Sequence, residues 1–165
     1  MGLIYKYRLK EREVKKITKR LESMIAGIDH TTFINDMEAA NVDLQNKIIL
    51  IGGLPVFIII DDEIFPTLLN TEVISELPSL IIDMGAVSHL CNGADLMAPG
   101  IVKITREFTA DALALVLDVR FSKPIALVKT LCASSEITEK KHGKVALNIH
   151  HVGDKFWEAF KHIKK

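Results

Sequence analysis

The residues best suited to chemistry lie in one stretch of the second half, DMGAVSHLCNGADLMAPGIV, from Asp83 to Val102. Gly93 and Gly100 have no side chain, so another backbone or the sugar-phosphate chain of a ligand can approach closely there. The alternative is that both glycines only make turns. The stretch therefore predicts either a close-approach site for a nucleotide chain or two structural turns.

The elements that would position these glycines are a short helix, a strand and a turn. Asp83 can cap the helix, because its carboxylate can accept a first-turn backbone N–H. Asn92-Gly93 tolerates the left-handed conformation that ends a helix. Residues 94–97 can run extended, and Pro99-Gly100 suits a tight turn in which glycine supplies the positive φ. Apolar residues three and four positions apart give the helix one stripe: Met84, Val87, Leu90 and Cys91.

Other kinds of chemistry find no support in the residue pattern. Cys91 and Cys132 follow no metal or redox spacing, and we expect small buried thiols. His150 and His151 are neighbours, but successive strand residues point to opposite faces and cannot readily chelate one ion. There is no phosphate loop and no Gly-x-Ser-x-Gly elbow. We therefore expect no metal, no cofactor and no enzymatic activity.

The segment GADLMAPGIV resembles the signature of the PUA domain, the RNA-binding module of pseudouridine synthases and archaeosine transglycosylases. A second segment, Asn148 to Trp157, resembles the closing part of such domains. Both motifs occur in the expected order, and the match runs from about Leu80 to Phe160. The resemblance implies a β pseudobarrel with helices at its ends and a cleft that holds an RNA end.

Carried over to this chain, the resemblance implies two walls and two flanking lysines. Backbone amides would hold sugar and phosphate, while apolar side chains would meet an unstacked base. Lys144 and Lys155 would neutralise phosphates. The first wall would hold Gly93, Ala94, Asp95, Leu96, Met97 and Pro99. The second would hold His150, His151, Gly153 and Lys155.

Two residues depart from the family pattern. His151 stands where an aromatic residue, commonly Tyr, is usual, so a stacking or packing contact is altered. Val128 stands where we expect glycine. If that glycine normally lets another backbone approach closely, the valine side chain would narrow the cleft.

Charge is distributed unevenly along the 165 residues, although the formal net charge is zero. Residues 1–25 carry a net charge of +5, residues 26–78 a net charge of −8, and residues 79–165 a net charge of +3. A basic second half fits a polyanionic partner or ordinary solvation. The longest apolar run, Ile48 to Ile60, is too short to span a bilayer. We expect a soluble, cytoplasmic protein.

The first half predicts a helix and a hairpin. From Lys10 to Ile28, apolar residues recur every three or four positions, as in an amphipathic helix with a basic outer face. That face is either solvated or a phosphate or ribosome contact. Gly52-Gly53 between residues 47–51 and 54–60 predicts a hairpin. Asp61 to Glu63 makes a turn, and Phe65 to Leu69 predicts a short helix entered at Pro66.

This hairpin and FPTLL resemble the N-terminal domain of one PUA subfamily, the translation-machinery-associated proteins typified by multiple copies in T-cell malignancy. We expect an α+β fold with two domains. Residues 1–77 form an N-terminal α/β domain of a helix and antiparallel strands, with 70–77 as a connector. Residues 78–165 form the PUA domain.

Alternating strands are predicted in the second half at residues 80–83, 101–105, 113–119, 124–132 and 144–150. In the last of these, Val145, Leu147 and Ile149 would share one face. Ser134 would cap a helical turn, and Asp154 a final helix. Trp157 is either a core plug or a base-stacking platform.

Three functions follow. The first is a non-catalytic RNA-binding protein of the translation apparatus, recognising a tRNA 3′ end or structured RNA on the small ribosomal subunit. The second is an adapter whose N-terminal domain docks a protein, and the resemblance implies an initiation-factor-like partner. The third is an accessory subunit of an RNA-modification enzyme.

Overall fold

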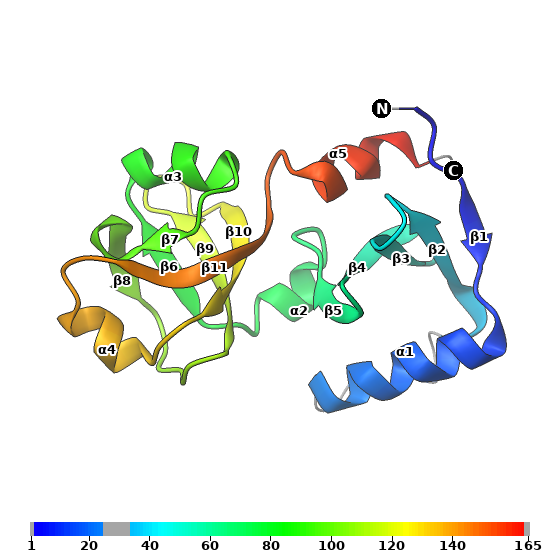
Figure 1. Cartoon of the computed structure of the whole chain (residues 1–165), viewed down its shortest axis with the longest axis horizontal. Coiled ribbons are helices and arrows are strands. Elements are labelled where there is room, and N and C mark those ends of the chain that lie inside the picture. Colours follow the sequence, from blue (N-terminus) through cyan, green and yellow to red (C-terminus); the bar gives the residue numbers. More distant parts are fainter. Residues whose placement is uncertain (1, 25–33, 164–165) are drawn as a thin grey trace. The chain divides into compact units, whose positions relative to one another are not determined.

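The computed structural model describes residues 2–24 and 34–163 and separates into two compact units (Figure 1). The first unit consists of Met1–Val73 and Glu158–Lys165, and the second of Ile74–Trp157. The division into domains 1–77 and 78–165 stays a prediction. In the structure the chain passes between units at residues 73 and 74, and the last eight residues group with the first unit.

The first unit is built on an antiparallel sheet whose strand order follows the chain. Its strands are β1 (Lys6–Arg8), β2 (Met37–Asn41), β3 (Lys47–Ile51), β4 (Leu54–Ile60) and β5 (Glu63–Pro66). Two-residue turns join β3 to β4 and β4 to β5, and a five-residue loop joins β2 to β3. Helix α1 (Glu11–Met24) and the 3-10 turn η2 (Ile34–Asp36) lie between β1 and β2 in the sequence.

Helix α1 has the predicted amphipathic pattern. Val14, Ile17 and Leu21 are buried one below another because residues three and four apart share a face of the helix. They pack into one core with Ile49 and Phe57 from the sheet. The predicted helix is confirmed through Met24, and Ile28 lies outside the described residues.

Residues with positive φ angles form the two tight hairpin turns of the first unit. Gly52 and Gly53 have φ values of 59° and 78°, which confirms the predicted turn. Asp61 and Asp62 also have positive φ, 47° and 65°, and Glu63 then begins β5. Aspartate tolerates this conformation better than most residues, which suits it to the turn.

The predicted helix at residues 65–69 is wrong. Phe65 lies in β5 and pairs with Ile58 of β4, and both side chains are buried. The Thr67 hydroxyl donates to the carbonyl of Pro55 at 2.8 Å and keeps the chain on the sheet. Pairing and burial therefore outweigh the helix-initiating tendency of Pro66. The helix of this region is α2 (Thr71–Ile74), inside the predicted connector.

The second unit is a six-stranded sheet with the order β7-β11-β10-β9-β6-β8, which curls into the predicted half-barrel (Figure 1). The β6–β9 pair is parallel and the other pairs are antiparallel. The strands are β6 (Ser79–Ile82), β7 (Leu96–Met97), β8 (Ile101–Ile104), β9 (Leu113–Asp118), β10 (Pro124–Thr130) and β11 (Lys144–His151). The helices are α3 (Met84–Cys91), η3 (Ala98–Gly100), α4 (Ser134–Glu139) and α5 (Lys155–His162), whose last residues group with the first unit.

One core fills the half-barrel. Leu80, Val116, Val128 and Val145, from four different strands, are completely buried. Leu90 of α3 packs into the same core. The predicted α+β class with a pseudobarrel in the second half is confirmed.

The segment around Gly100 differs from its prediction. Residues 98–100 form a single 3-10 turn, and Gly100 does not have a positive φ. A Cβ on Gly100 would lie 2.8 Å from the Cβ of Ala86, closer than side chains allow. Glycine is therefore required there because α3 packs against this turn, and not because of the turn's dihedral angles.

The predicted alternation along β11 is also wrong. Register shifts interrupt its pairing, one of them opposite the step from Leu127 to Val128. As a result Leu147 is 36% exposed, whereas His150 is completely buried. Bulges move side chains from one face to the other, and the alternating sequence does not reveal where they occur.

Helix α4 begins one residue earlier than predicted. Ala133 is the N-cap, and its N–H donates to the Glu136 carboxylate at 2.8 Å. Ser134 is buried, and its hydroxyl oxygen accepts from the Phe108 N–H at 3.1 Å. Ser134 thus ties a loop to the helix instead of capping it.

Among the described helices, none is both long and apolar enough to cross a lipid bilayer.

Candidate nucleic-acid interface

Helix α3 delivers the glycine loop. The Asp83 carboxylate accepts from the Ala86 N–H at 2.8 Å and caps the helix as predicted. At the other end Gly93 has a φ of 88°, and the Ala94 N–H donates to the His89 carbonyl at 3.0 Å. This left-handed ending turns the chain out of the helix and leaves Gly93 on the surface.

The side chain of Asp95, directly before β7, and side chains of β11 fasten that loop to the sheet. The Asp95 carboxylate accepts from the Asn148 N–H at 2.8 Å and pairs with the Lys144 ammonium at 2.7 Å. The Asn148 amide donates to the carbonyls of Leu90 and Ala94 at 3.0 and 2.9 Å. Four contacts therefore fix the end of α3 on β11.

The pKa of Asp95 lies below its ordinary value. Partial burial alone would raise this pKa, but the Lys144 ammonium and the Asn148 N–H stabilise the carboxylate and outweigh burial. Asp95 is therefore ionised at neutral pH, and its charge is bound by groups of the protein.

A second aspartate organises the facing turn. Asp154 accepts from the N–H groups of His151 and Trp157 at 3.0 and 2.8 Å, so it caps α5 as predicted. In addition, Oδ2 of Asp154 lies 2.7 Å from Nδ1 of the buried His150. Burial would raise the pKa of Asp154, but His150 and the two N–H donors lower it below its ordinary value. Gly153, with a φ of 89°, completes the turn.

The two predicted walls lie next to each other. A Cβ placed on Gly93 would lie 3.5 Å from Nε2 of His151, and one on Gly153 would lie 3.9 Å from the carbonyl oxygen of Cys91. Both glycines have positive φ, so larger residues would be strained there as well as obstructive. The space beside Gly93 is bordered by main chain and by the His151 ring.

The predicted residues divide between the two ends of β11. Met97 pairs with Lys144 at the start of that strand, whereas Gly93 and Gly153 approach its end. Seven residue steps separate Lys144 from His151, or about 23 Å of extended chain. The predicted residues therefore form a stripe long enough for several nucleotides, and not one compact pocket.

Two predicted residues do not reach the surface. Leu96 is 1% exposed and His150 is 0% exposed, so their side chains hold the walls in place and offer no contact area to a ligand. Met97, by contrast, is 47% exposed, and Ala94, Pro99 and Lys155 are exposed as well. Val128 lies in the core, so this departure from the family pattern does not narrow the surface.

One feature of this unit was missed at the sequence level. Phe121 lies between the strands predicted at 113–119 and 124–132, and its side chain is 63% exposed between two cations. An exposed aromatic residue flanked by Arg120 and Lys123 is a readable signal in the sequence VRFSK.

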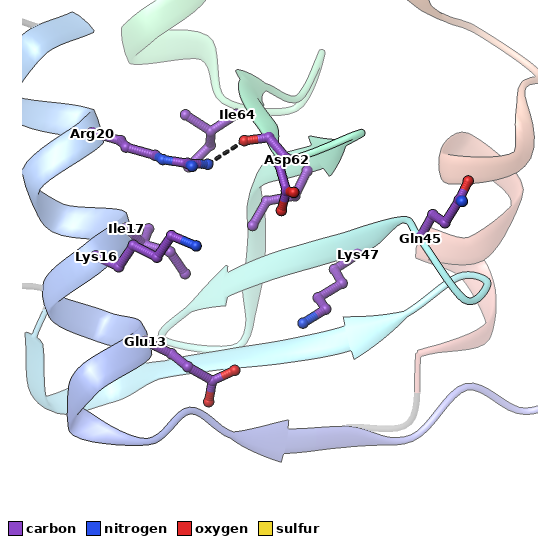
Figure 2. Close-up of a pocket in the computed structure, with 9 residues that line it drawn as sticks. Glu13, Lys16, Ile17, Arg20, Gln45, Lys47, Asp62 and Ile64 are labelled. Atoms are coloured by element: carbon purple, nitrogen blue, oxygen red, sulfur yellow. Dashed lines mark hydrogen bonds between the residues drawn. The ribbon is translucent and has the colours of Figure 1, made fainter.

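The first unit contains a separate small pocket between α1 and the sheet (Figure 2). It encloses about 130 Å³. Figure 2 shows Lys16 reaching from α1 toward the sheet and Lys47 reaching from β3 toward α1. Neither ammonium group has an ion pair within the described part of the chain. The pocket is lined by Glu13, Lys16, Ile17, Arg20, Gln45, Lys47, Ile59, Asp62 and Ile64.

The described residues offer no arrangement of side chains suited to a metal ion. Within residues 2–24 and 34–163, no three His, Cys, Asp or Glu side chains gather in a way that could hold a metal ion. Asp83, Asp95 and Asp154 all accept backbone N–H groups, which explains their positions.

Family comparisons divide the chain at a similar place. The PUA domain model matches residues 78–152, and a domain of unknown function, DUF1947, matches residues 5–71. Uncharacterized protein MJ1432 of Methanocaldococcus jannaschii is 35% identical over 159 residues, covering 95% of this chain and 98% of that protein.

Two further comparisons concern translation and structure. Translation machinery-associated protein 20 of Schizosaccharomyces pombe is 28% identical over 82 residues, which cover 47% of this chain and 45% of that protein. The crystal structure of hypothetical protein PH0734.1 from Pyrococcus horikoshii has 31% sequence identity and a TM-score of 0.75. It covers 94% of this chain and 99% of that one.

Proposed function

The chain belongs to the PUA-domain family that includes protein MJ1432 and translation machinery-associated protein 20, and we propose that it is a non-catalytic RNA-binding protein of the translation apparatus. The PUA domain indicates RNA binding, and the translation machinery-associated relatives indicate a role in translation. The finer proposal is that its ligand is a tRNA 3′ end or structured RNA on the small ribosomal subunit.

The observation that carries this proposal is the positive-φ Gly93 facing His151, with the positive-φ Gly153 beside the carbonyl of Cys91. The N–H groups of Gly93 and Ala94 donate to the carbonyls of Leu90 and His89. What this main-chain wall offers sugar and phosphate is close approach without a side chain in the way. An unpaired RNA end suits it because its bases are already unstacked. Met97, exposed on the same stripe, offers apolar area to such a base.

Charge supports the same ligand. Lys144 lies on the stripe with its side chain 48% exposed, and Lys155 is exposed beside the Gly153 turn. Contacts of this kind release counterions from RNA, so affinity should fall as salt rises. Asp95 takes up part of the charge of Lys144, and the Lys155 ammonium lies 5.3 Å from the centre of the Phe156 ring.

The experiment compares a tRNA with the same tRNA lacking its 3′-terminal nucleotides, using the full chain and fluorescence anisotropy. We expect at least a tenfold loss of affinity on truncation. Equal affinity for both RNAs would contradict recognition of the 3′ end and would leave structured RNA as the ligand. Absence of salt-dependent binding to either RNA would contradict the proposed function altogether.

A second candidate function is a protein-interaction adapter, and the pocket of the first unit favours it. Lys16 and Lys47 face a floor of isoleucines, an arrangement that fits an acidic residue beside a small aliphatic one on an initiation-factor-like partner. Calorimetric titration with such a purified protein tests the idea. Binding that is unchanged in the Lys16→Glu, Lys47→Glu double variant would contradict it.

A further inference from the structure

The turn between β9 and β10 is held by one buried carboxylate. Asp118 is 3% exposed and accepts from the N–H groups of Phe121 and Lys123 at 2.5 and 2.9 Å. Its own N–H donates to the Lys123 carbonyl at 3.2 Å, and Ser122 takes a positive φ of 52°. The pKa of Asp118 lies below its ordinary value, mainly because the hydrogen bond from the Phe121 N–H stabilises the ionised carboxylate. The turn is therefore fixed before any ligand arrives.

This rigid turn holds an aromatic ring out in solvent. Phe121 is 63% exposed, and the neighbouring Val119 is 47% exposed. The guanidinium carbon of Arg120 and the ammonium of Lys123 each lie 6.0 Å from the centre of the ring. Neither cation has an ion pair among the residues that the structure describes. Packing within the protein does not explain why this side chain is phenylalanine.

The arrangement matches what proteins use to hold single-stranded nucleic acid. An exposed aromatic face stacks on a base, and cations beside it neutralise the adjoining phosphates. A protein partner fits less well, because a stable protein interface buries about 800 Å² on each side, far more than one ring and one valine offer.

The turn lies at the end of the sheet where β11 finishes and where Gly93 lies beside His151. β6 and β9 are parallel, and the Val119 N–H donates to the carbonyl of Ile82, directly before the Asp83 cap of α3. On the other side, the Val152 N–H donates to the Ile125 carbonyl, which places the start of β10 beside the end of β11.

We propose that Phe121, flanked by Arg120 and Lys123, is a stacking platform for an unpaired RNA base. The inference rests on the proposed RNA-binding function and extends it to a second contact beyond the glycine stripe. A strand whose end lies beside Gly93 would continue across this end of the sheet to the turn.

The test uses the full chain and two fluorescein-labelled RNAs, a twelve-nucleotide oligoadenylate and a blunt-ended duplex without unpaired nucleotides. Phe121→Leu keeps apolar area but removes the π face, so its affinity for oligoadenylate should fall about tenfold. Phe121→Trp should bind as tightly as the natural chain or more tightly. Duplex binding should change less than twofold in both variants.

The cations have matched controls. Arg120→Gln and Lys123→Gln should each weaken oligoadenylate binding about threefold and lower the slope of log affinity against log salt by about 0.7. Lys103→Gln, an exposed lysine on β8, should change neither quantity. Thermal unfolding should be unaffected in every variant because these side chains are exposed.

The outcomes separate the two proposals. If the natural chain binds oligoadenylate and Phe121→Leu binds it equally well, the platform is refuted while the RNA-binding function stands. If Leu and Trp weaken binding equally, the role is shape and not stacking, and the platform is refuted again. If the natural chain binds neither the oligonucleotides nor tRNA, both proposals fail.

Discussion

The two units use their aspartates in different ways. In the second unit Asp83, Asp95, Asp118 and Asp154 each accept at least one backbone N–H at a loop or turn. In the first unit Asp43 does the same for Gln45 and Asn46, but the turn at Asp61 and Asp62 is closed by positive φ angles, with both residues exposed.

The difference matters for an anionic ligand. A carboxylate that already accepts N–H groups or a lysine has its negative charge partly compensated by neighbouring dipoles and charges. These four carboxylates of the second unit therefore repel an anionic ligand less strongly than carboxylates without such partners would. In the first unit, Asp61 and Asp62 are exposed, and within the described part of the chain no backbone N–H donates to either carboxylate. The aspartates of the second unit thus build loops that tolerate RNA nearby.

The largest effect is expected at Asp154. Asp154→Ala removes a helix cap, worth about 1 kcal/mol, and a hydrogen bond to buried His150, worth about 2 kcal/mol when charged. We expect urea unfolding to report a loss of about 3 kcal/mol.

The matched control is Glu158→Ala in the same helix. Glu158 forms an exposed pair with Lys161, so the loss should stay below about 0.5 kcal/mol. Equal losses in the two variants would show that Asp154 does not organise its turn.

The next effect separates RNA binding from stability. Gly93→Leu and Gly53→Leu both force a large residue into a positive φ, at a cost of about 1 to 3 kcal/mol each. Only Gly93 lies beside the second wall, so only its variant should lose RNA affinity, by tenfold or more. If Gly93→Leu loses stability but no affinity, the glycine has a purely structural role.

The sequence predicted elements well where local chemistry decides them. Asp83 and Asp154 cap their helices, and Gly52-Gly53 closes its hairpin, because each motif satisfies nearby backbone groups by itself. The predictions from sequence are wrong at Phe65 and along β11, where pairing with neighbouring strands decides the local structure. Pairing between distant segments leaves no trace in the spacing of residues.

The candidate site was likewise predicted from the sequence only in part. The motif pointed to Gly93 and His151, which the structure brings together. It also named Leu96 and His150 as contact residues, although both are buried, because exposure depends on where bulges fall. Phe121 was missed since a single exposed ring has no periodicity.

A smaller effect concerns pH and Asp95. Its folded pKa is lowered, so its ionised form stabilises the fold above the ordinary pKa of about 3.9, and this stability is lost as pH falls through the lower folded pKa. Asp95→Asn should lower stability at pH 7 by about 0.5 kcal/mol, because the pair with Lys144 is partly exposed. Unfolding free energies measured from pH 7 to pH 2 should therefore converge for the two chains. A constant difference would contradict an ionic role.

The smallest effect tests the contrast between the units. Lys16→Gln combined with Lys47→Gln removes two unpaired ammonium groups from the first unit, yet RNA affinity should change less than twofold. Lys155→Gln in the second unit should weaken RNA binding about threefold and reduce its salt dependence. Anisotropy titrations at several salt concentrations measure both. A larger effect from the first pair would assign RNA binding to the first unit.

The main-chain wall at Gly93 also bears on how recognition can evolve in this protein. Every residue brings the same amide and carbonyl, so point mutations can block such a wall but cannot readily redirect its preference from one nucleotide to another. Side chains such as Phe121 can be exchanged singly, and new preferences for particular bases would arise there. Adaptation to a different RNA is therefore expected to begin at the side chains around the fixed wall.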